Sequence, residues 1–267
     1  MTVTRRLKDT IKPIVENALK PFGYQLHLTN VKATDSVVFD RKMLLAFLRP
    51  DATRRLYDEG IRRADSLDTD NFAKQCRFYS LIENVQHVLR RGVQGDVAEC
   101  GCWRGHSSYM IAKTLSTGGF NSTFHIFDSF EGGLSELGPE DINARRTLTP
   151  EEVKLQKESF ASSEEKVRRV LAPFPFVRLY SGWIPDRFPE VKDTKFRFVH
   201  IDVDLYQPTV DSMNFFYPRL ERGGVMAFDD YGMSQFPGTK QAVDEYLSDK
   251  DYQMFYEIPT GGGFVIK

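Results

Sequence analysis

The sequence predicts an α/β fold, with a mixed sheet of seven strands that is parallel except for an antiparallel C-terminal hairpin, and with an N-terminal helical extension. Three observations lead to this prediction. From residue 95 onward, short apolar runs alternate with segments of helical period, which is the pattern of βαβ units. Residues 252–267 form two strand-like runs around a glycine-rich turn, a typical hairpin pattern. Residues 1–90, in contrast, have helical period only.

The first 90 residues are interpreted as a helical region without a chemical motif. Apolar residues recur at helical spacing over residues 7–19 and again over residues 72–89. Apolar stripes of this kind usually pack against another surface. Residues 1–90 are therefore expected to cap the main domain or to form a subunit interface, and a homo-oligomer (a dimer or larger) is expected.

The main domain is expected to span residues 91–267. Parallel strands are predicted at residues 97–100, 123–127, 177–180, 196–201 and 225–228, helices at 107–115, 208–217 and 240–247, and hairpin strands at 252–258 and 264–267. A Rossmann-like parallel sheet that ends in an antiparallel hairpin is the arrangement of class I methyltransferases. The same ending is unusual in nicotinamide-binding domains.

A polar insertion interrupts this alternation at about residues 131–160. Its first half is rich in Ser, Gly, Pro and charged residues, whereas Thr149-Pro-Glu is typical of a helix start. Long loops in compact domains are usually functional or disordered. We expect a lid over the substrate, with a solvent-exposed loop as the alternative.

Composition and charge exclude several classes of protein. A net charge of −1 and a pI near 6.5 argue against a general nucleic-acid surface. No apolar run approaches the roughly 18 residues of a membrane span, and the basic N-terminus lacks the apolar segment of a signal peptide. The odd number of cysteines, Cys76, Cys100 and Cys102, indicates reduced thiols and a cytoplasmic protein.

A glycine turn follows the first predicted strand, in Glu99-Cys-Gly-Cys-Trp-Arg-Gly-His-Ser. Gly101 permits a sharp bend, and Gly105 permits close approach of the backbone to a ligand before the helix begins. Asp128 follows the second strand, where a carboxylate can accept hydrogen bonds from a ribose; a helix cap or turn residue is the alternative. Trp183 is expected to be a packing residue, although it lies where an adenine ring can stack. These residues predict a nucleotide cofactor, but they do not distinguish an adenosyl cofactor from NAD.

Two acidic clusters follow the fourth and fifth predicted strands. Asp202 and Asp204 come after the fourth strand, and Asp229 and Asp230 come after the fifth. No Lys or Arg is next to either cluster in the sequence, and such carboxylates are costly without a counter-charge. Because the two strand ends share one edge of the sheet, Mg²⁺ or another hard divalent cation is predicted there. Asp204 is a candidate proton acceptor or, alternatively, a helix cap.

The order of these motifs resembles that of the macrocin O-methyltransferase family. The resemblance covers about residues 95–250. It is carried by Glu99-Cys-Gly-Cys-Trp-Arg-Gly, Asp128-Ser-Phe-Glu-Gly, Ser181-Gly-Trp, Ile201-Asp-Val-Asp-Leu-Tyr-Gln-Pro-Thr, Tyr217-Pro-Arg-Leu-Glu-Arg-Gly-Gly and Phe228-Asp-Asp-Tyr-Gly. The family uses S-adenosylmethionine and Mg²⁺ to methylate sugar hydroxyls of macrolides and related natural products.

The resemblance implies roles for individual residues. The metal would be held by Asp202, Asp229 and Asp230, and Asp204 would act as the general base, with Asp202 also at the catalytic centre. The cofactor would be bound by Glu99, Gly101, Gly105, Ser107, Asp128, Ser129, Ser181, Trp183 and Asp202. The small-molecule acceptor would be a glycosylated or hydroxylated natural product, with two of its hydroxyls chelated by the metal.

Two departures from the family leave the acceptor open: Gly105 is followed by His106, where relatives often carry a second glycine, and the insertion after residue 131 is longer. Three alternatives remain. A catechol-type O-methyltransferase would act on an aromatic diol, but usually places a Lys where this chain has Asp204. A nicotinamide-dependent oxidoreductase would share the glycine turn and Asp128 without needing the Asp pair. A non-catalytic module would use the ion structurally.

Overall fold

The computed structural model describes residues 52–142 and 149–267, all within one compact unit of residues 46–267. The helix predicted at residues 7–19 and the middle of the predicted lid, residues 143–148, lie outside the described residues. The division of the chain at residue 90 therefore remains a prediction.

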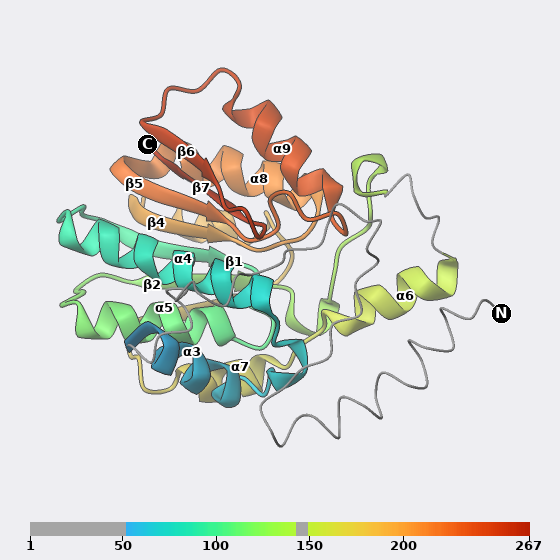
Figure 1. Cartoon of the computed structure of the whole chain (residues 1–267), viewed down its shortest axis with the longest axis horizontal. Coiled ribbons are helices and arrows are strands. Elements are labelled where there is room, and N and C mark those ends of the chain that lie inside the picture. The colour runs from blue at the N-terminus through green and yellow to red at the C-terminus, as the bar shows by residue number, and fades with distance from the viewer. Residues whose placement is uncertain (1–51, 143–148) are drawn as a thin grey trace, which may run out of the picture. The chain divides into compact units, whose positions relative to one another are not determined.

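The described part of the chain contains the predicted seven-stranded mixed sheet (Figure 1). Its strands are β1 (Asp96–Cys100), β2 (Phe124–Asp128), β3 (Val177–Ser181), β4 (Phe196–Ile201), β5 (Leu220–Phe228), β6 (Met254–Glu257) and β7 (Gly263–Ile266). The order is β3-β2-β1-β4-β5-β7-β6. The first five strands are parallel, whereas β7 runs antiparallel to both β5 and β6. The predicted fold class is thereby confirmed.

Two α-helices of the described residues precede the sheet, α3 (Ala52–Arg63) and α4 (Phe72–Arg90). Parallel strands are connected through α5 (His106–Thr117), α6 (Pro150–Ser159), α7 (Glu164–Leu171) and α8 (Tyr206–Phe216), and α9 (Pro237–Leu247) leads from β5 to the hairpin. The predicted helix start at Thr149 is confirmed, since its hydroxyl accepts a hydrogen bond from the backbone of Glu152 at 3.2 Å. Helix α7 was not predicted, because its eight residues are mostly charged and only a short stripe, Val167, Val170 and Leu171, is buried.

The two faces of the sheet carry separate apolar cores. Val97 and Phe124 belong to the core that includes residues of α4, α5 and α7, whereas Ala98 and Phe127 belong to the core under α8 and α9. Figure 1 shows the corresponding layers, with α4 and α5 on one side of the strands and α8 and α9 on the other. Side chains thus alternate between the two cores along each strand. Because β2, β1, β4 and β5 are neighbouring parallel strands, their carboxyl ends lie together at one end of the sheet.

The strand bounds differ from the predicted ones mainly at β5, which begins at Leu220 instead of residue 225. Its pairing with β4 shifts register between Phe196 and Phe198, and two glycines at Gly223 and Gly224 break the apolar pattern. A strand that contains such an irregularity has no clear period in its sequence.

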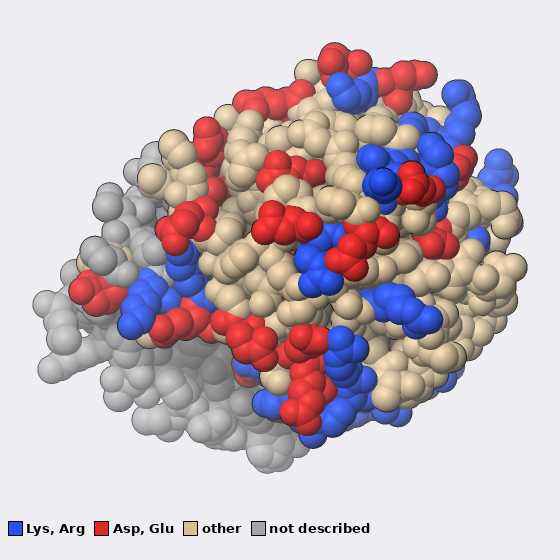
Figure 2. Space-filling view, turned by 180° about the vertical axis from the view of Figure 1, so that it is seen from behind, with Lys and Arg blue, Asp and Glu red and all other residues tan. Residues whose placement is uncertain are grey.

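The surface and the cysteines add two observations. On the face in Figure 2, basic and acidic side chains are interspersed. All three cysteines are free thiols, two of them buried.

Within residues 52–142 and 149–267, no helix combines the length and apolar character needed to cross a bilayer.

Candidate active site

A cavity of about 380 Å³ opens at the carboxyl edge of the sheet, within the usual size range of small-ligand sites. Its wall includes most of the residues that the sequence singled out, namely Gly101, Ser107, Asp128, Ser129, Trp183, Asp202, Asp204, Asp229 and Asp230. The opposite part of the wall comes from α4 and the segment before it: Thr69, Asn71, Lys74, Arg77 and Phe78. The cavity thus joins the glycine turn and the acidic clusters in one site.

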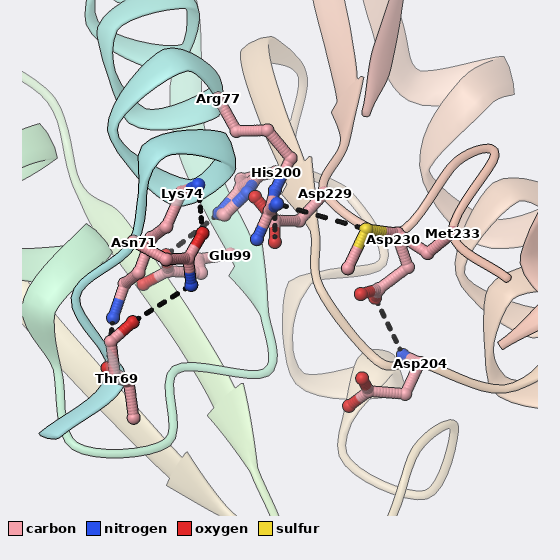
Figure 3. A network of polar contacts seen from close by, with 10 residues as sticks. All are labelled: Thr69, Asn71, Lys74, Arg77, Glu99, His200, Asp204, Asp229, Asp230 and Met233. Atoms are coloured by element: carbon pink, nitrogen blue, oxygen red, sulfur yellow. Dashed lines mark hydrogen bonds and ion pairs between the residues drawn. The ribbon is translucent and has the colours of Figure 1, made fainter. Parts of the chain in front are cut away.

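The four aspartates converge as the sequence predicted. Carboxylate oxygens of Asp202, Asp204 and Asp230 lie within 4.8 Å of one another, and a second group with the same spacing joins Asp202 to Asp229 and His200. Asp204 adopts a left-handed backbone conformation, with φ of 62°, which is uncommon for a residue other than glycine. Its amide donates a hydrogen bond to Asp230 Oδ2 at 3.0 Å (Figure 3). The turn after β4 is therefore held against the end of β5.

Burial and mutual repulsion disfavour full ionisation of this cluster. Burial, followed by the charges of the neighbouring aspartates, raises the pKa of Asp202 and of Asp204 well above the ordinary value. Burial and the charge of Asp229 raise the pKa of Asp230 to about 7. Carboxylates crowded in this way are the oxygen ligands that a hard divalent cation prefers, so the donor set fits such an ion.

The counter-charge that the sequence neighbourhood lacks comes from α4, in a region where sequence analysis found no chemical motif. Arg77 Nε lies 3.0 Å from Asp229 Oδ2, with both side chains about nine-tenths buried (Figure 3). Although burial opposes ionisation of Asp229, the charge of Arg77 holds the pKa of that carboxyl below its ordinary value. Lys74, one helical turn earlier, donates from Nζ to Thr69 Oγ1 at 2.7 Å.

A buried polar pair, His200 and Glu99, lies next to the aspartate cluster. His200, in β4, and Glu99, in β1, are both fully buried, and His200 Nδ1 lies 2.9 Å from Glu99 Oε1. Since a carboxylate only accepts, Nδ1 donates this bond. The second oxygen of Glu99 accepts from the hydroxyl of Ser108. Glu99 therefore orients His200 toward the Asp202–Asp229 group.

The glycine turn has one position that excludes any side chain. Gly101 has φ of 80°, and a Cβ atom there would lie 1.8 Å from the carbonyl oxygen of Asp202. Asp128 holds the next residues of the turn: Oδ2 accepts from the amides of Cys102 and Trp103 at 2.6 and 2.9 Å, and Oδ1 accepts from the amide of Phe130 at 2.6 Å. The predicted ribose ligand is thus also the residue that shapes the turn.

Three residues of the predicted cofactor set do not line the cavity. Glu99 lies behind the wall with Ser108 and His200. Gly105 would direct a Cβ toward Val167. The carbonyl of Ser181 accepts a hydrogen bond from Arg187. These three residues support the turns around the cavity, and their predicted contact with the cofactor remains a prediction.

The fold is that of class I O-methyltransferases. The O-methyltransferase NovP superposes with a TM-score of 0.65 at 24% identity, covering 81% of this chain and 99% of that protein. The calicheamicin methyltransferase CalS11 follows with a TM-score of 0.56 at 19% identity over 86% of this chain and 99% of its own. An O-methyltransferase from Bacillus cereus, solved in complex with SAH (S-adenosylhomocysteine), has a TM-score of 0.50 at 15% identity over 83% of this chain and 94% of its own.

The sequence identifies the family within that class. The profile of the Macrocin-O-methyltransferase (TylF) family matches residues 26–258, so the chain belongs to this family and is an O-methyltransferase. The resemblance found in the motifs is confirmed, and the oxidoreductase and the non-catalytic module are set aside.

The named relatives are O-methyltransferases. Demethyldecarbamoylnovobiocin O-methyltransferase of Streptomyces niveus is 30% identical over 72% of this chain and 68% of its own length. The 8-demethyl-8-(2,3-dimethoxy-alpha-L-rhamnosyl)-tetracenomycin-C 4'-O-methyltransferase of Streptomyces olivaceus is 31% identical over 61% of each chain. Mycinamicin III 3''-O-methyltransferase of Micromonospora griseorubida is 31% identical over 62% of this chain and 66% of its own.

Proposed function

We propose that this enzyme transfers a methyl group from S-adenosylmethionine to a hydroxyl of a sugar carried by a natural product, and that it requires Mg²⁺. The observation that carries the proposal is the convergence of Asp202, Asp204, Asp229 and Asp230 in the wall of the cavity that also contains the Gly101 turn. Methyl donor, acceptor and cation would thus share one site at the carboxyl ends of the parallel strands.

The metal would be held by Asp202, Asp229 and Asp230. With a divalent cation held by these residues, the pKa of an acceptor hydroxyl would be lowered and two neighbouring hydroxyls would be oriented for transfer. Arg77 pairs with Oδ2 of Asp229, and Asp229 also offers a carboxylate oxygen to the group that includes Asp202 and His200. Oxygen ligands favour Mg²⁺ over softer metals.

Asp204 would accept the proton of the acceptor hydroxyl. Its carboxylate borders the same cavity and lies within 4.8 Å of ligand oxygens of Asp202 and Asp230. The alternative role as a helix cap loses support, because the cap residue of α8 is Leu205 and makes no side-chain capping bond. Asp202 would serve both the metal and the methyl donor, since its carbonyl adjoins Gly101.

The adenosine part of the donor would lie between Asp128, Ser129 and Trp183. Trp183 is 44% exposed although it lines the cavity, so its ring offers a free face for stacking. The proposed acceptor class is supported by a relative whose name specifies a rhamnosyl group and a 4'-O-methyltransferase activity. An aromatic diol is the second candidate, but no Lys occupies the place of Asp204.

The test is a transfer assay with isotopically labelled S-adenosylmethionine, run in Mg²⁺ or in EDTA. Acceptors are a panel of glycosides with neighbouring sugar hydroxyls and a matched set of catechols. We expect labelled glycoside in the reaction with Mg²⁺ and none in the reaction with EDTA. Asp204→Asn should lower kcat by about 10²- to 10⁴-fold while leaving calorimetric binding of SAH unchanged. Equal turnover in EDTA refutes the metal, and exclusive labelling of catechols refutes the sugar acceptor.

A further inference from the structure

The wall that α4 contributes to the cavity contains a buried cation without a carboxylate partner. Lys74 is only 8% exposed, and within the described residues no carboxylate lies within ion-pair distance of its Nζ. Its single hydrogen bond goes to the neutral hydroxyl of Thr69. Burial lowers the pKa of Lys74, and the charges of Asp229 and Asp202 offset this only in part. A lysine is seldom buried in this way without a partner.

A buried acceptor lies beside this cation. His106 opens α5, is 3% exposed and lines the same cavity. Its Nε2 lies 3.2 Å from the carbonyl oxygen of Tyr57. Because a carbonyl only accepts, Nε2 carries the proton and Nδ1 keeps a lone pair. Nδ1 is itself buried and, among the residues that the structure describes, has no hydrogen-bond partner.

Both groups contact one aromatic ring and therefore form one subsite. Lys74 Nζ lies 5.3 Å from the centroid of the Phe78 ring, and the His106 ring lies 4.7 Å from the same centroid. Burial and the charge of Lys74 lower the pKa of His106 to about 3, so the imidazole is neutral at neutral pH. The subsite thus offers one positive donor and one neutral acceptor.

The start of α5 adds to the positive side. Its N-terminus has no side-chain cap, and its first two residues, His106 and Ser107, line the cavity. Uncapped amides at a helix N-terminus attract a carboxylate. The rest of the wall is strongly acidic: its two basic residues in the described chain, Lys74 and Arg77, face five aspartates, and Arg77 is already paired with Asp229. A carboxylate on the ligand therefore needs Lys74.

The geometry points to Lys74 and His106 as the subsite for the amino-acid end of the methyl donor: Lys74, with the start of α5, binds the carboxylate, and His106 Nδ1 accepts from the ammonium group. This inference rests on the proposed function, since it assumes that S-adenosylmethionine binds in this cavity. It makes Lys74 of helix α4 a determinant of specificity for a zwitterionic donor. This helix lies outside the sequence motifs that form the glycine turn.

The experiment compares ligands that differ only at that end. S-adenosylhomocysteine and 5'-methylthioadenosine, which lacks the amino-acid end, are titrated calorimetrically in EDTA into the wild type and Lys74→Met. Lys74→Met should weaken S-adenosylhomocysteine binding by about 10- to 100-fold and change methylthioadenosine binding by less than about twofold. Lys74→Arg should retain most of the affinity. Lys113→Met, at an exposed position of α5, is the matched control and should behave as wild type.

The role of His106 is tested with decarboxylated S-adenosylmethionine, which keeps the ammonium group and lacks the carboxylate. His106→Phe, which retains an aromatic ring beside Tyr57 and Phe78, should weaken this ligand, whereas Lys74→Met should not. Binding of methylthioadenosine reports that each variant is folded.

Several outcomes overturn the inference while leaving the proposed function intact. One is an unchanged affinity of Lys74→Met for S-adenosylhomocysteine. Another is an equal loss of affinity of Lys74→Met for S-adenosylhomocysteine and for methylthioadenosine, especially if its affinity for Mg²⁺ also changes. In that case the role of Lys74 would be only to neutralise Asp202 and Asp229. If the wild type binds neither ligand, the proposed function itself fails, and the inference with it.

Discussion

The buried ion pair between Arg77 and Asp229 makes a quantitative prediction about the metal site. Arg77→Met removes the charge but keeps much of the aliphatic stem, so Asp229 loses its partner at 3.0 Å while nine-tenths buried. Breaking a buried pair from one side costs about 3–5 kcal/mol. Because the carboxyl can escape part of this cost by taking up a proton, we expect the lower end, about 3 kcal/mol. For a chain of this size, that lowers Tm by about 6–12 °C.

The assay is thermal unfolding in EDTA and in Mg²⁺. A cation bound to Asp229 replaces the lost counter-charge, so Mg²⁺ should stabilise Arg77→Met more than it stabilises the wild type. The matched control is Arg90→Met on the same helix, whose partner Glu83 is 3.9 Å away and exposed. Such surface pairs contribute about 0–1 kcal/mol, so its Tm should change little in either buffer.

The stability that the Arg77–Asp229 pair contributes should also depend on pH in a defined direction. Because Arg77 holds the pKa of Asp229 below its ordinary value of 3.8, the contribution of the pair is complete above that value and is lost as the pH falls through the lowered pKa. In Arg77→Met the unpaired, buried carboxyl takes up a proton at a higher pH than in the wild type, so the difference in stability between the two proteins should narrow steadily as the pH falls. The reasoning is refuted if Arg77→Met in EDTA matches Arg90→Met, or if Mg²⁺ stabilises the wild type and Arg77→Met equally.

Three further predictions follow from the site. Burial and a neighbouring charge raise the pKa of Asp230 to about 7, so the stability gained from its protonated form is lost as the pH rises through that value. Because the ordinary pKa of this group is 3.8, Tm in EDTA should fall as the pH rises from about 4 to about 7 and level off above that, and saturating Mg²⁺ should abolish the fall. Gly101→Ala places a Cβ 1.8 Å from a carbonyl oxygen and should cost more than about 4 kcal/mol in urea unfolding. Gly119→Ala, with similar φ but open space, should cost about 1–2 kcal/mol, and equal losses would exclude close approach as the cause. Both tryptophans, Trp103 and Trp183, line the cavity, so SAH should change the intrinsic fluorescence; if Trp183→Phe retains the full change, stacking on that ring is wrong.

The acidic half of the site could be predicted because each residue directly follows an apolar strand. Asp202 follows β4 and Asp229 follows β5, and the carboxyl ends of adjacent parallel strands always meet. Strand periodicity and a rule of topology were sufficient, with no knowledge of packing. The same reasoning placed Asp128 and Gly101 correctly in the cavity wall.

The basic half was missed because its residues come from a helix more than a hundred positions away in the sequence. Arg77 and Asp229 are separated by 152 residues, and no local pattern joins them. One signal was nevertheless present. The apolar stripe of α4 continues backward from Val85 through Leu81 and Phe78 to Lys74, so a lysine occupies a core-facing position of an amphipathic helix. A charge at such a position indicates a buried partner or a ligand.

The arrangement of charges on α4 has a consequence for how the two ligands influence each other. Lys74 and Arg77 are one turn apart on the same helix, so a displacement of that helix would move the backbone of both. In the proposed function, a cation bound to Asp229 would compete with Arg77 for this carboxylate, and any resulting shift of α4 would carry Lys74 with it. The two binding equilibria would then be thermodynamically linked. By reciprocity, the factor by which Mg²⁺ alters the affinity for S-adenosylhomocysteine must equal the factor by which S-adenosylhomocysteine alters the affinity for Mg²⁺.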